Sequence, residues 1–543
     1  MTDQAYVFAA DERPTFPGSP YAPRHPTWRK VGYASVAVIS ALGSTLGNNL
    51  VTVNVQSLSG SLGIYVAQAS VLPAIYVAMN ATANLSLIKA RVQFGIPAIT
   101  HILVAAYAVS AIIQLVFPGF ATAILNRGFC GLAAAALTTF TVYNLLQVFS
   151  GKFRPLALLV GISLPQLGMP LSRMIPVELL ALDDWRGLHL LELATAVTVL
   201  AASFLLPLPP SDRSKAIGKL DVVTVALIVP AILLVCSVLG IGRLLWWADT
   251  PWLGIALATA VPLLCAAWLL EHLRERPLIL TRWIGTPDIL RFAGIALVVR
   301  LALAEQSYGA VGLLTSGGLN NDQLHALFAY VGVAMVTGLI AAIVTLRPDR
   351  IPHQVCAAAI VIAIGAWLDS DATNITRPEQ LYLSQAMIGF GTVLFIGPAF
   401  LFGFIRMLQR GPDALVTCIV VFSVTQNVGG LAGSAFLGTY QIERARAHVS
   451  ALSDHVLAGN PMVSDRLRGG AASVAGVIGD PNQQATQGAA LLGQTLSKEA
   501  NILAYNDVFQ LVALIAASTA LYLLFLILRR DWRARRTPNG VPA

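Results

Sequence analysis

The sequence is poor in charged residues: aspartate, glutamate, lysine and arginine make up only 11% of its 543 residues, whereas hydrophobic residues make up 56%. A soluble globular protein carries roughly a quarter charged residues, and one of this length would need several domains with charged surfaces. The scarcity excludes a soluble enzyme, a nucleic-acid-binding protein, a fibrous protein and a disordered chain. With a mean hydropathy of +0.71, it predicts an all-α integral membrane protein with many spans.

Cysteine is also scarce, and the common catalytic motifs are missing. The five cysteines, Cys130, Cys236, Cys265, Cys356 and Cys418, lie in apolar segments without the spacing of a metal site or a disulfide framework. No G-x-x-x-x-G-K-[ST], H-E-x-x-H or G-x-S-x-G motif occurs. We therefore expect no cofactor, no metal and no enzymatic activity, and we expect ATP not to be the direct energy source.

Long apolar runs dominate what is present. A helix needs about 20 apolar residues to cross a bilayer, and fourteen runs reach or approach this length. The expected spans are approximately 32–57, 67–88, 96–117, 121–148, 155–180, 186–208, 220–240, 251–270, 289–316, 323–346, 351–369, 380–405, 414–440 and 504–528. The shortest run, 351–369, and the run 289–316, which contains Arg300 and Glu305, fit the pattern least well.

The distribution of basic residues predicts the orientation. If both termini are cytoplasmic, fourteen lysines and arginines fall in short inner loops and three fall in short outer loops. Such a bias is typical of cytoplasmic loops, so the net charge of +8 reflects membrane orientation and not nucleic-acid binding. One long segment, 441–503, remains outside. It is interpreted as two polar helices with a loose turn, as a mobile loop, or as a docking surface for a periplasmic partner.

Seven stretches resemble the motifs of one transporter family. They are GSTLGNNLVTVNVQSLSGSLG in span 1, NRGFCGLAAAAL in span 4, DDWRGLHLLELATA after span 5, KLDVVTVAL before span 7, WLLEHLRERPLILTRWI before span 9, SVTQNVGGLAGSAFLG in span 13 and AYNDVFQLVAL in span 14. In this order and at this spacing, the chain resembles the fourteen-span drug:proton antiporters of the major facilitator superfamily, the EmrB/QacA type.

This resemblance implies a fold of two six-helix bundles with two extra central spans. The parts expected are a cytoplasmic tail (1–31), an N-terminal bundle (32–208), a two-span linker region (209–288), a C-terminal bundle (289–528) that includes the segment 441–503, and a basic cytoplasmic tail (529–543).

Several family positions differ in this chain. The acid of span 1 falls at Gly47, the glutamine of the span 4 motif is Cys130, and the loop after span 2 keeps only Arg91 and its basic character. The span 5 signature is reduced to Pro165, Gly168 and Pro170, and Gln426 or Asn427 stands at the span 13 arginine. The fold inference does not depend on these positions, but the details of coupling do.

Ionisable residues inside the membrane are costly and indicate function by default. The proton-coupling candidates are Glu305, Arg127, Arg300, Glu192 and Asp507. Glu305 is the first choice because an apolar setting can let a carboxyl bind and release a proton. The alternatives are a fixed salt bridge from Glu305 to an arginine of span 4 or 5, a structural cation at Arg127, and an interfacial helix cap at Asp507, which is favoured there.

Polar residues in the spans suggest a substrate path. Asn48, Thr52 and Gln56 share one face of span 1, and Asn49 is adjacent. The remaining candidates are Arg173, Asn144 and Gln426. The alternative is polar packing between helices, worth around 0.6 kcal/mol per bond. If the buried arginines line a cavity, the substrate is expected to be anionic or neutral.

The function expected is a secondary active, proton-coupled exporter of drugs, organic acids or similar amphipathic compounds across the inner (plasma) membrane. The resemblance also implies a periplasmic adaptor protein and an outer-membrane channel as partners. The alternatives are a transport-inactive relative that acts as a membrane receptor or scaffold, and a membrane-embedded enzyme.

Overall fold

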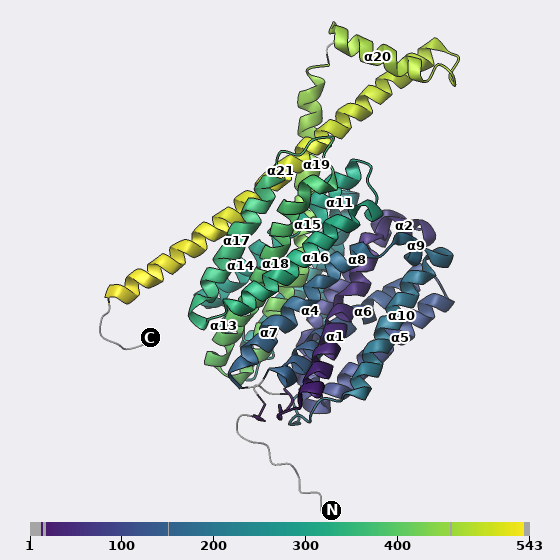
Figure 1. The fold of residues 1–543 in the computed structure, drawn as a ribbon. Helices are drawn as coiled ribbons and strands as arrows, with labels where there is room; N and C mark the ends of the chain where they lie inside the picture. Colours follow the sequence, from purple (N-terminus) through teal and green to yellow (C-terminus); the bar gives the residue numbers. More distant parts are fainter. Residues whose placement is uncertain (1–11, 15–17, 150, 457–458, 537–543) are drawn as a thin grey trace, which may run out of the picture.

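A computed structural model describes residues 12–14, 18–149, 151–456 and 459–536. Within these residues the chain is helical without any strand, and thirteen helices are long and apolar enough to cross a membrane. Because lipid offers no hydrogen-bond partners, an apolar segment satisfies its backbone within the bilayer only as a helix or a closed barrel. Figure 1 shows these helices packed side by side as one bundle.

The N-terminal half of the bundle is built around one buried helix. It contains α1 (Thr27–Val53), α4 (Val71–Phe94), α5 (Ile96–Val116), α6 (Phe120–Val148), α7 (Arg154–Ser163), η3 (Leu164–Leu167), α8 (Gly168–Met174) and α10 (Leu182–Leu205). Helix α6 packs against α1, α4, α5 and α7, and α10 packs against α5. The short helices α2 (Val55–Ser61), α3 (Val66–Ala69) and α9 (Val177–Leu180) connect them.

The C-terminal half has the same kind of packing. It contains α14 (Pro287–Ala302), α15 (Glu305–Ser316), η4 (Asn321–Leu324), α16 (His325–Val344), α17 (Ile351–Leu368), α18 (Tyr382–Arg410), α19 (Leu415–Ser453) and α21 (Pro481–Arg536). Helix α18 packs against α16 and α17, and α21 packs against α17 and α19.

Two expected spans are interrupted. The run 289–316 forms α14 and α15, separated by Leu303 and Ala304, and neither helix alone is long enough to count as a span. The sequence predicts fourteen spans, and this run is the one that is absent from the thirteen long apolar helices of the described chain. The run 155–180 ends at Met174 and contains a 3₁₀ turn at Pro165, because proline has no backbone N–H to donate and its ring disrupts the helix.

Two further helices lie beside the bundle, and the first of them packs against both halves. Helix α11 (Lys219–Leu245) packs against α12 (Pro251–Leu273), against α4 and against α19. Ion pairs stabilise the position of α11 and α12. Lys89 Nζ lies 2.7 Å from Asp221 Oδ2. Arg274 Nη2 lies 2.9 Å from Asp221 Oδ1, and its Nη1 lies 2.6 Å from Glu271 Oε1. The short helix α13 (Thr281–Ile284) leads into α14. The placement is that of the two central spans expected from the sequence.

The segment 441–503 extends two long helices and adds one short helix between them, instead of forming two separate polar helices. Helix α19 runs on to Ser453, α20 covers Pro461–Ser473, and α21 begins at Pro481, 23 residues before the expected start of its span at 504. We call residues 441–456 and 459–503 the hairpin. Figure 1 shows that the hairpin projects from one end of the bundle, which we call the hairpin end. Helix α1 begins, and helix α21 ends, toward the opposite end.

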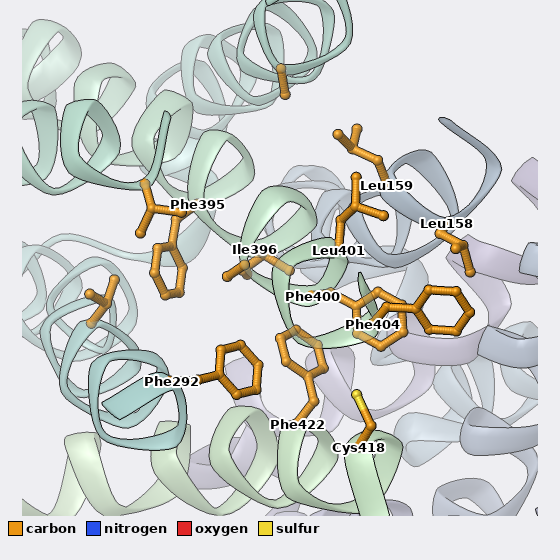
Figure 2. Packing of buried hydrophobic residues seen from close by; sticks show 14 of the residues in the cluster. Leu158, Leu159, Phe292, Phe395, Ile396, Phe400, Leu401, Phe404, Cys418 and Phe422 are labelled. Atoms are coloured by element: carbon orange, nitrogen blue, oxygen red, sulfur yellow. The ribbon is translucent and has the colours of Figure 1, made fainter. Parts of the chain in front are cut away.

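Apolar packing joins the two halves away from the hairpin. Figure 2 shows Leu158 and Leu159 of α7 beside Leu401, Phe400 and Phe404 of α18. All five belong to one buried cluster, and the ring of Phe400 also makes an edge contact with Phe422 of α19 at 5.0 Å between centroids. The halves therefore meet through side chains that can separate without leaving a buried charge behind.

Candidate functional site

A cavity of about 360 Å³ lies between the two halves of the bundle. Its wall is formed by α1, α4, α6 and α7 from one half and by α14, α15, α18 and α19 from the other. Five of the predicted site residues line it: Asn48, Asn49, Thr52, Arg300 and Gln426. The structure thus brings together residues from span 1, span 9 and span 13.

The charge of the cavity wall is positive. Arg91 and Arg300 line it, and the described lining residues include neither aspartate nor glutamate. Arg300 Nε donates to the Gln426 carbonyl oxygen at 3.0 Å. Its guanidinium lies against α19 at Gly430, where an added Cβ would come within 2.9 Å of Nη2. Glycine at this position therefore leaves room for the arginine.

Arg91 occupies a different position from the one its motif predicts. The sequence places it in an inner loop, whereas the structure places it in the last turn of α4, only 2% exposed, with Nη2 3.4 Å from the Ala135 carbonyl oxygen. Helix α4 continues to Phe94 and ends at Gly95, whose φ of 92° suits glycine. Because the helix extends past Arg91, this residue lies in the wall of the cavity.

Several uncharged polar atoms of the cavity wall have no partner. Both amide atoms of Gln426 and the carbonyl oxygens of the Asn48 and Asn84 side chains are buried without a hydrogen bond. In contrast, Asn80 Nδ2 lies 3.3 Å from Asn427 Oδ1 and joins α4 to α19. Buried polar groups are almost always hydrogen-bonded, so the unpartnered ones are available to a bound molecule.

Arg127 and Glu192 form a separate cluster inside the N-terminal half. They make a buried ion pair between α6 and α10, with Arg127 2% and Glu192 1% exposed. Asn126 Nδ2 donates to Glu192 Oε2 at 3.0 Å, His189 Nδ1 lies 3.1 Å from the same oxygen, and Arg127 Nη1 donates to the Gly47 carbonyl oxygen at 3.1 Å. Arg127, Asn126 and His189 also border a smaller cavity of about 230 Å³.

Glu192 lies where the resemblance places the missing acid of span 1. A Cβ added to Gly47 would lie 3.1 Å from Glu192 Oε1 and 2.8 Å from the Tyr107 hydroxyl. The carboxylate beside Arg127 is therefore supplied by α10 instead of α1. The sequence contains both residues, but only the packing of the helices brings Glu192 close to Gly47.

Glu305 is buried behind the cavity wall and not on it. It is 0% exposed and accepts a hydrogen bond from Gln385 Nε2 at 3.0 Å through Oε1. The expected alternative, a salt bridge to an arginine of span 4 or 5, is wrong for the described chain, where Glu305 has no cation within 4.0 Å. Gln385 Nε2 also donates to Asp369 Oδ2 at 2.7 Å.

Sequence reasoning missed Asp369. This residue directly follows α17 and is 2% exposed. At the end of an expected span, an aspartate is normally placed in the interface with water. The signal that could have identified it is the pair Asp369 and Gln385, two polar residues at facing ends of consecutive spans.

Four other predicted residues lie away from the cavity. Gln56 is exposed on α2, because α1 ends at Val53 and the chain turns at Asn54. Asn144 is buried and donates to the Phe140 carbonyl oxygen at 2.8 Å. Arg173 donates to Asn321 Oδ1 at 3.2 Å and lies over the Phe328 ring, so it links the two halves at the hairpin end.

Asp507 is the last of these four predicted residues. Its Oδ2 atom lies 2.6 Å from Arg444 Nε and 2.7 Å from His448 Nε2. The predicted helix cap at Asp507 is wrong, because α21 begins at Pro481 and Asp507 lies in its interior. Its contacts join α21 to α19 near the base of the hairpin.

Comparison with known proteins identifies the fold. No protein-family model and no curated protein matches the sequence. The structure is similar to that of the human organic anion transporter MFSD10 (TETRAN), with a TM-score of 0.52 and 12% identity, covering 91% of this chain and 100% of that one.

Two peptide transporters are similar to the same degree. A bacterial homologue of the human drug peptide transporters PepT1 and PepT2 has a TM-score of 0.51 and 11% identity, covering 93% of this chain and 99% of that one. A structure described for proton dependent oligopeptide transporters has a TM-score of 0.53 and 12% identity, covering 93% and 100%. At this identity the likeness shows the fold: the chain is an all-helical, multi-pass integral membrane protein with the fold of major facilitator transporters.

Proposed function

We propose that this protein is a secondary active transporter that exports amphipathic small organic compounds across the inner (plasma) membrane in exchange for protons. The observation that carries the proposal is the cavity between the two halves, whose wall includes polar atoms without partners. Transporters of this kind bind substrate near the midplane, between two repeats that rock against each other. The apolar contact between α7 and α18 suits such movement.

The substrate class we favour is anionic or neutral. Arg91 and Arg300 provide the charge of the cavity wall, and no described acid opposes them there. An organic cation would have to approach two guanidinium groups in a setting where charge interactions are weakly screened. The name of one structural neighbour, an organic anion transporter, agrees with this choice.

The proposed orientation places the hairpin outside the cell and both termini in the cytoplasm. Two of the basic residues counted in the expected inner loops, Lys89 and Arg274, both pair with Asp221 in the first turn of α11, which supports placing this part of the chain on the cytoplasmic side. A membrane potential contributes about 2.3 kcal/mol per charge per 100 mV. The projecting hairpin is the part on which a periplasmic adaptor, and through it an outer-membrane channel, could dock.

The test is transport by the purified protein in vesicles. A panel of fluorescent or radiolabelled organic anions and cations is offered with and without a proton gradient. We expect gradient-dependent movement of one or more anions and its loss in Arg300→Gln, whereas Arg468→Gln, in the exposed hairpin, is unchanged. Normal anion export by Arg300→Gln would refute the substrate class. No transport of any compound by folded protein would favour the receptor or scaffold.

A further inference from the structure

Two buried acids in the C-terminal half share one amide. Glu305, the first residue of α15, and Asp369, the residue after α17, both accept a hydrogen bond from Gln385 Nε2, at 3.0 Å and 2.7 Å. Both carboxyl groups therefore lie within hydrogen-bonding distance of a single nitrogen. We call Glu305 and Asp369 the acid pair.

The remaining carboxyl oxygens of the acid pair have no partner. Glu305 Oε2 and Asp369 Oδ1 are buried without a hydrogen bond, and the two residues are 0% and 2% exposed. Within the described chain, no lysine, arginine or histidine lies within ion-pair distance of either one. An ionised carboxylate without a partner is very costly in an apolar interior.

Groups on the packed elements do not compensate for this charge. On α21, Tyr505 contacts Tyr308 of α15, and Asp507 is already paired with Arg444 and His448. Arg243 of α11 lies over the Tyr308 ring, 4.7 Å from its centroid. Two neighbouring carboxylates that lack a cation cannot both be ionised without a large cost, so binding one proton stabilises the pair.

The acid pair lies between the cavity and the hairpin end. Asp369 is followed by a turn in which residues 371 and 373–375 are exposed. On the other side, Gln306 lines the cavity and donates to the Gln385 carbonyl oxygen at 3.1 Å. Gln385 therefore contacts the acid pair through its side chain and the cavity wall through its backbone.

We propose that Glu305 and Asp369, bridged by the side-chain amide of Gln385, form a proton-binding site that is loaded from the hairpin end of the molecule. One proton from water on that side bonds to a carboxylate oxygen, which removes one negative charge from the buried pair, and the same O–H bond breaks when the proton leaves. This proposal deepens the proposed proton coupling and rests on it, but the binding of the proton can be measured without any substrate.

The experiment uses dicyclohexylcarbodiimide, which reacts with protonated carboxyl groups in apolar surroundings. The reconstituted full-length protein is treated between about pH 5 and about pH 9, and the modified residues are identified by mass spectrometry. We expect modification of Glu305 or Asp369 that falls about tenfold per pH unit above its midpoint. Glu192 is the internal control, because its ion pair with Arg127 keeps it ionised and unmodified.

Two further measurements test whether both acids belong to the site and from which side of the membrane the proton enters. In Glu305→Gln, modification of Asp369 should have a lower pH midpoint, since the like charge is gone. In vesicles with the hairpin outward, modification should follow the external pH and not the internal pH.

Three results would overturn the site: no modification of either acid at low pH in folded protein, modification that does not vary with pH, or protection by sodium ions at constant pH, which would indicate a metal-cation site. Modification as expected, together with vesicles that transport nothing, would refute the proposed function and leave the proton site standing. Proton-driven transport with an unreactive acid pair would refute only the site.

Discussion

Individual side chains show how a buried arginine obtains a counter-charge although span 1 contains no acid. Gly47 cannot supply it, and a side chain there would meet the Tyr107 hydroxyl at 2.8 Å. Glu192 reaches the same place from α10 and accepts bonds from Asn126 and Arg127. The requirement that a buried charge be paired is therefore met by a residue distant in sequence.

Replacing Glu192 with glutamine should destabilise the protein strongly. The change leaves the Arg127 guanidinium buried without its counter-charge, which costs about 3–5 kcal/mol. Thermal unfolding of the detergent-purified protein measures the effect. The control is Asp507→Asn, which breaks a partly exposed pair with Arg444 and should cost about 1 kcal/mol or less. Equal effects of the two variants would contradict the structural role of the Arg127–Glu192 pair.

Replacing Gln426 with leucine should separate binding from stability. Both amide atoms of Gln426 are buried without a partner, and such groups cost about 1–3 kcal/mol. We therefore expect Gln426→Leu to be at least as stable as the parent but to lose affinity for the transported compound. Gln385→Leu is the contrast, because it removes two hydrogen bonds to the acid pair and should lower the unfolding temperature. A marked loss of stability in Gln426→Leu would show that this residue is structural.

Among the helices, close approach depends on particular glycines. Gly131 of α6 faces α4, where an added Cβ would lie 2.6 Å from the Tyr76 carbonyl oxygen, whereas nothing lies within 4 Å of a Cβ at Gly128 on the same helix. Small residues at such contacts let two membrane helices pack backbone to backbone.

The two glycines therefore give a matched test on one helix. Gly131→Ala should lower the free energy of unfolding by about 1–3 kcal/mol, because the backbone of α4 must move away. Gly128→Ala should be neutral or stabilising by up to about 1 kcal/mol, since alanine favours a helix more than glycine does. Unfolding in a denaturing detergent compares the two. A similar loss in both variants would mean that α4 and α6 are not in close contact.

For the molecule as a whole, the hairpin and the linker between α10 and α11 lie at opposite ends of the bundle. Gly476, in the hairpin, is exposed with open space around it, and Ser214, in that linker, is also exposed. The proposed orientation places the first outside and the second in the cytoplasm.

Cysteine labelling in intact cells tests this orientation. A membrane-impermeant maleimide should label Gly476→Cys directly and Ser214→Cys only after the membrane is permeabilised. The parent protein is the blank, because four of its five cysteines are buried and Cys265, in the interior of α12, is placed within the membrane. The reverse pattern would invert the topology, and labelling of both variants from outside would contradict a bundle that separates these two positions.

The sequence by itself determined the class of protein and the positions of most of its long apolar helices, because hydropathy acts locally along each span. It also identified Asn48, Asn49, Thr52, Arg300 and Gln426, which the structure brings to one cavity. The predicted positions of Gln56 and Arg91 were wrong, because each depends on where a helix ends.

Only the tertiary structure decided which buried groups meet. The pairing of Arg127 with Glu192, the bridge from Gln385 to Glu305 and Asp369, and the separation of Arg173 from the cavity all join residues far apart in sequence. The physical reason is that the cost of a buried charge depends on its neighbours in space, and no periodicity along one helix specifies which face of another helix it will touch.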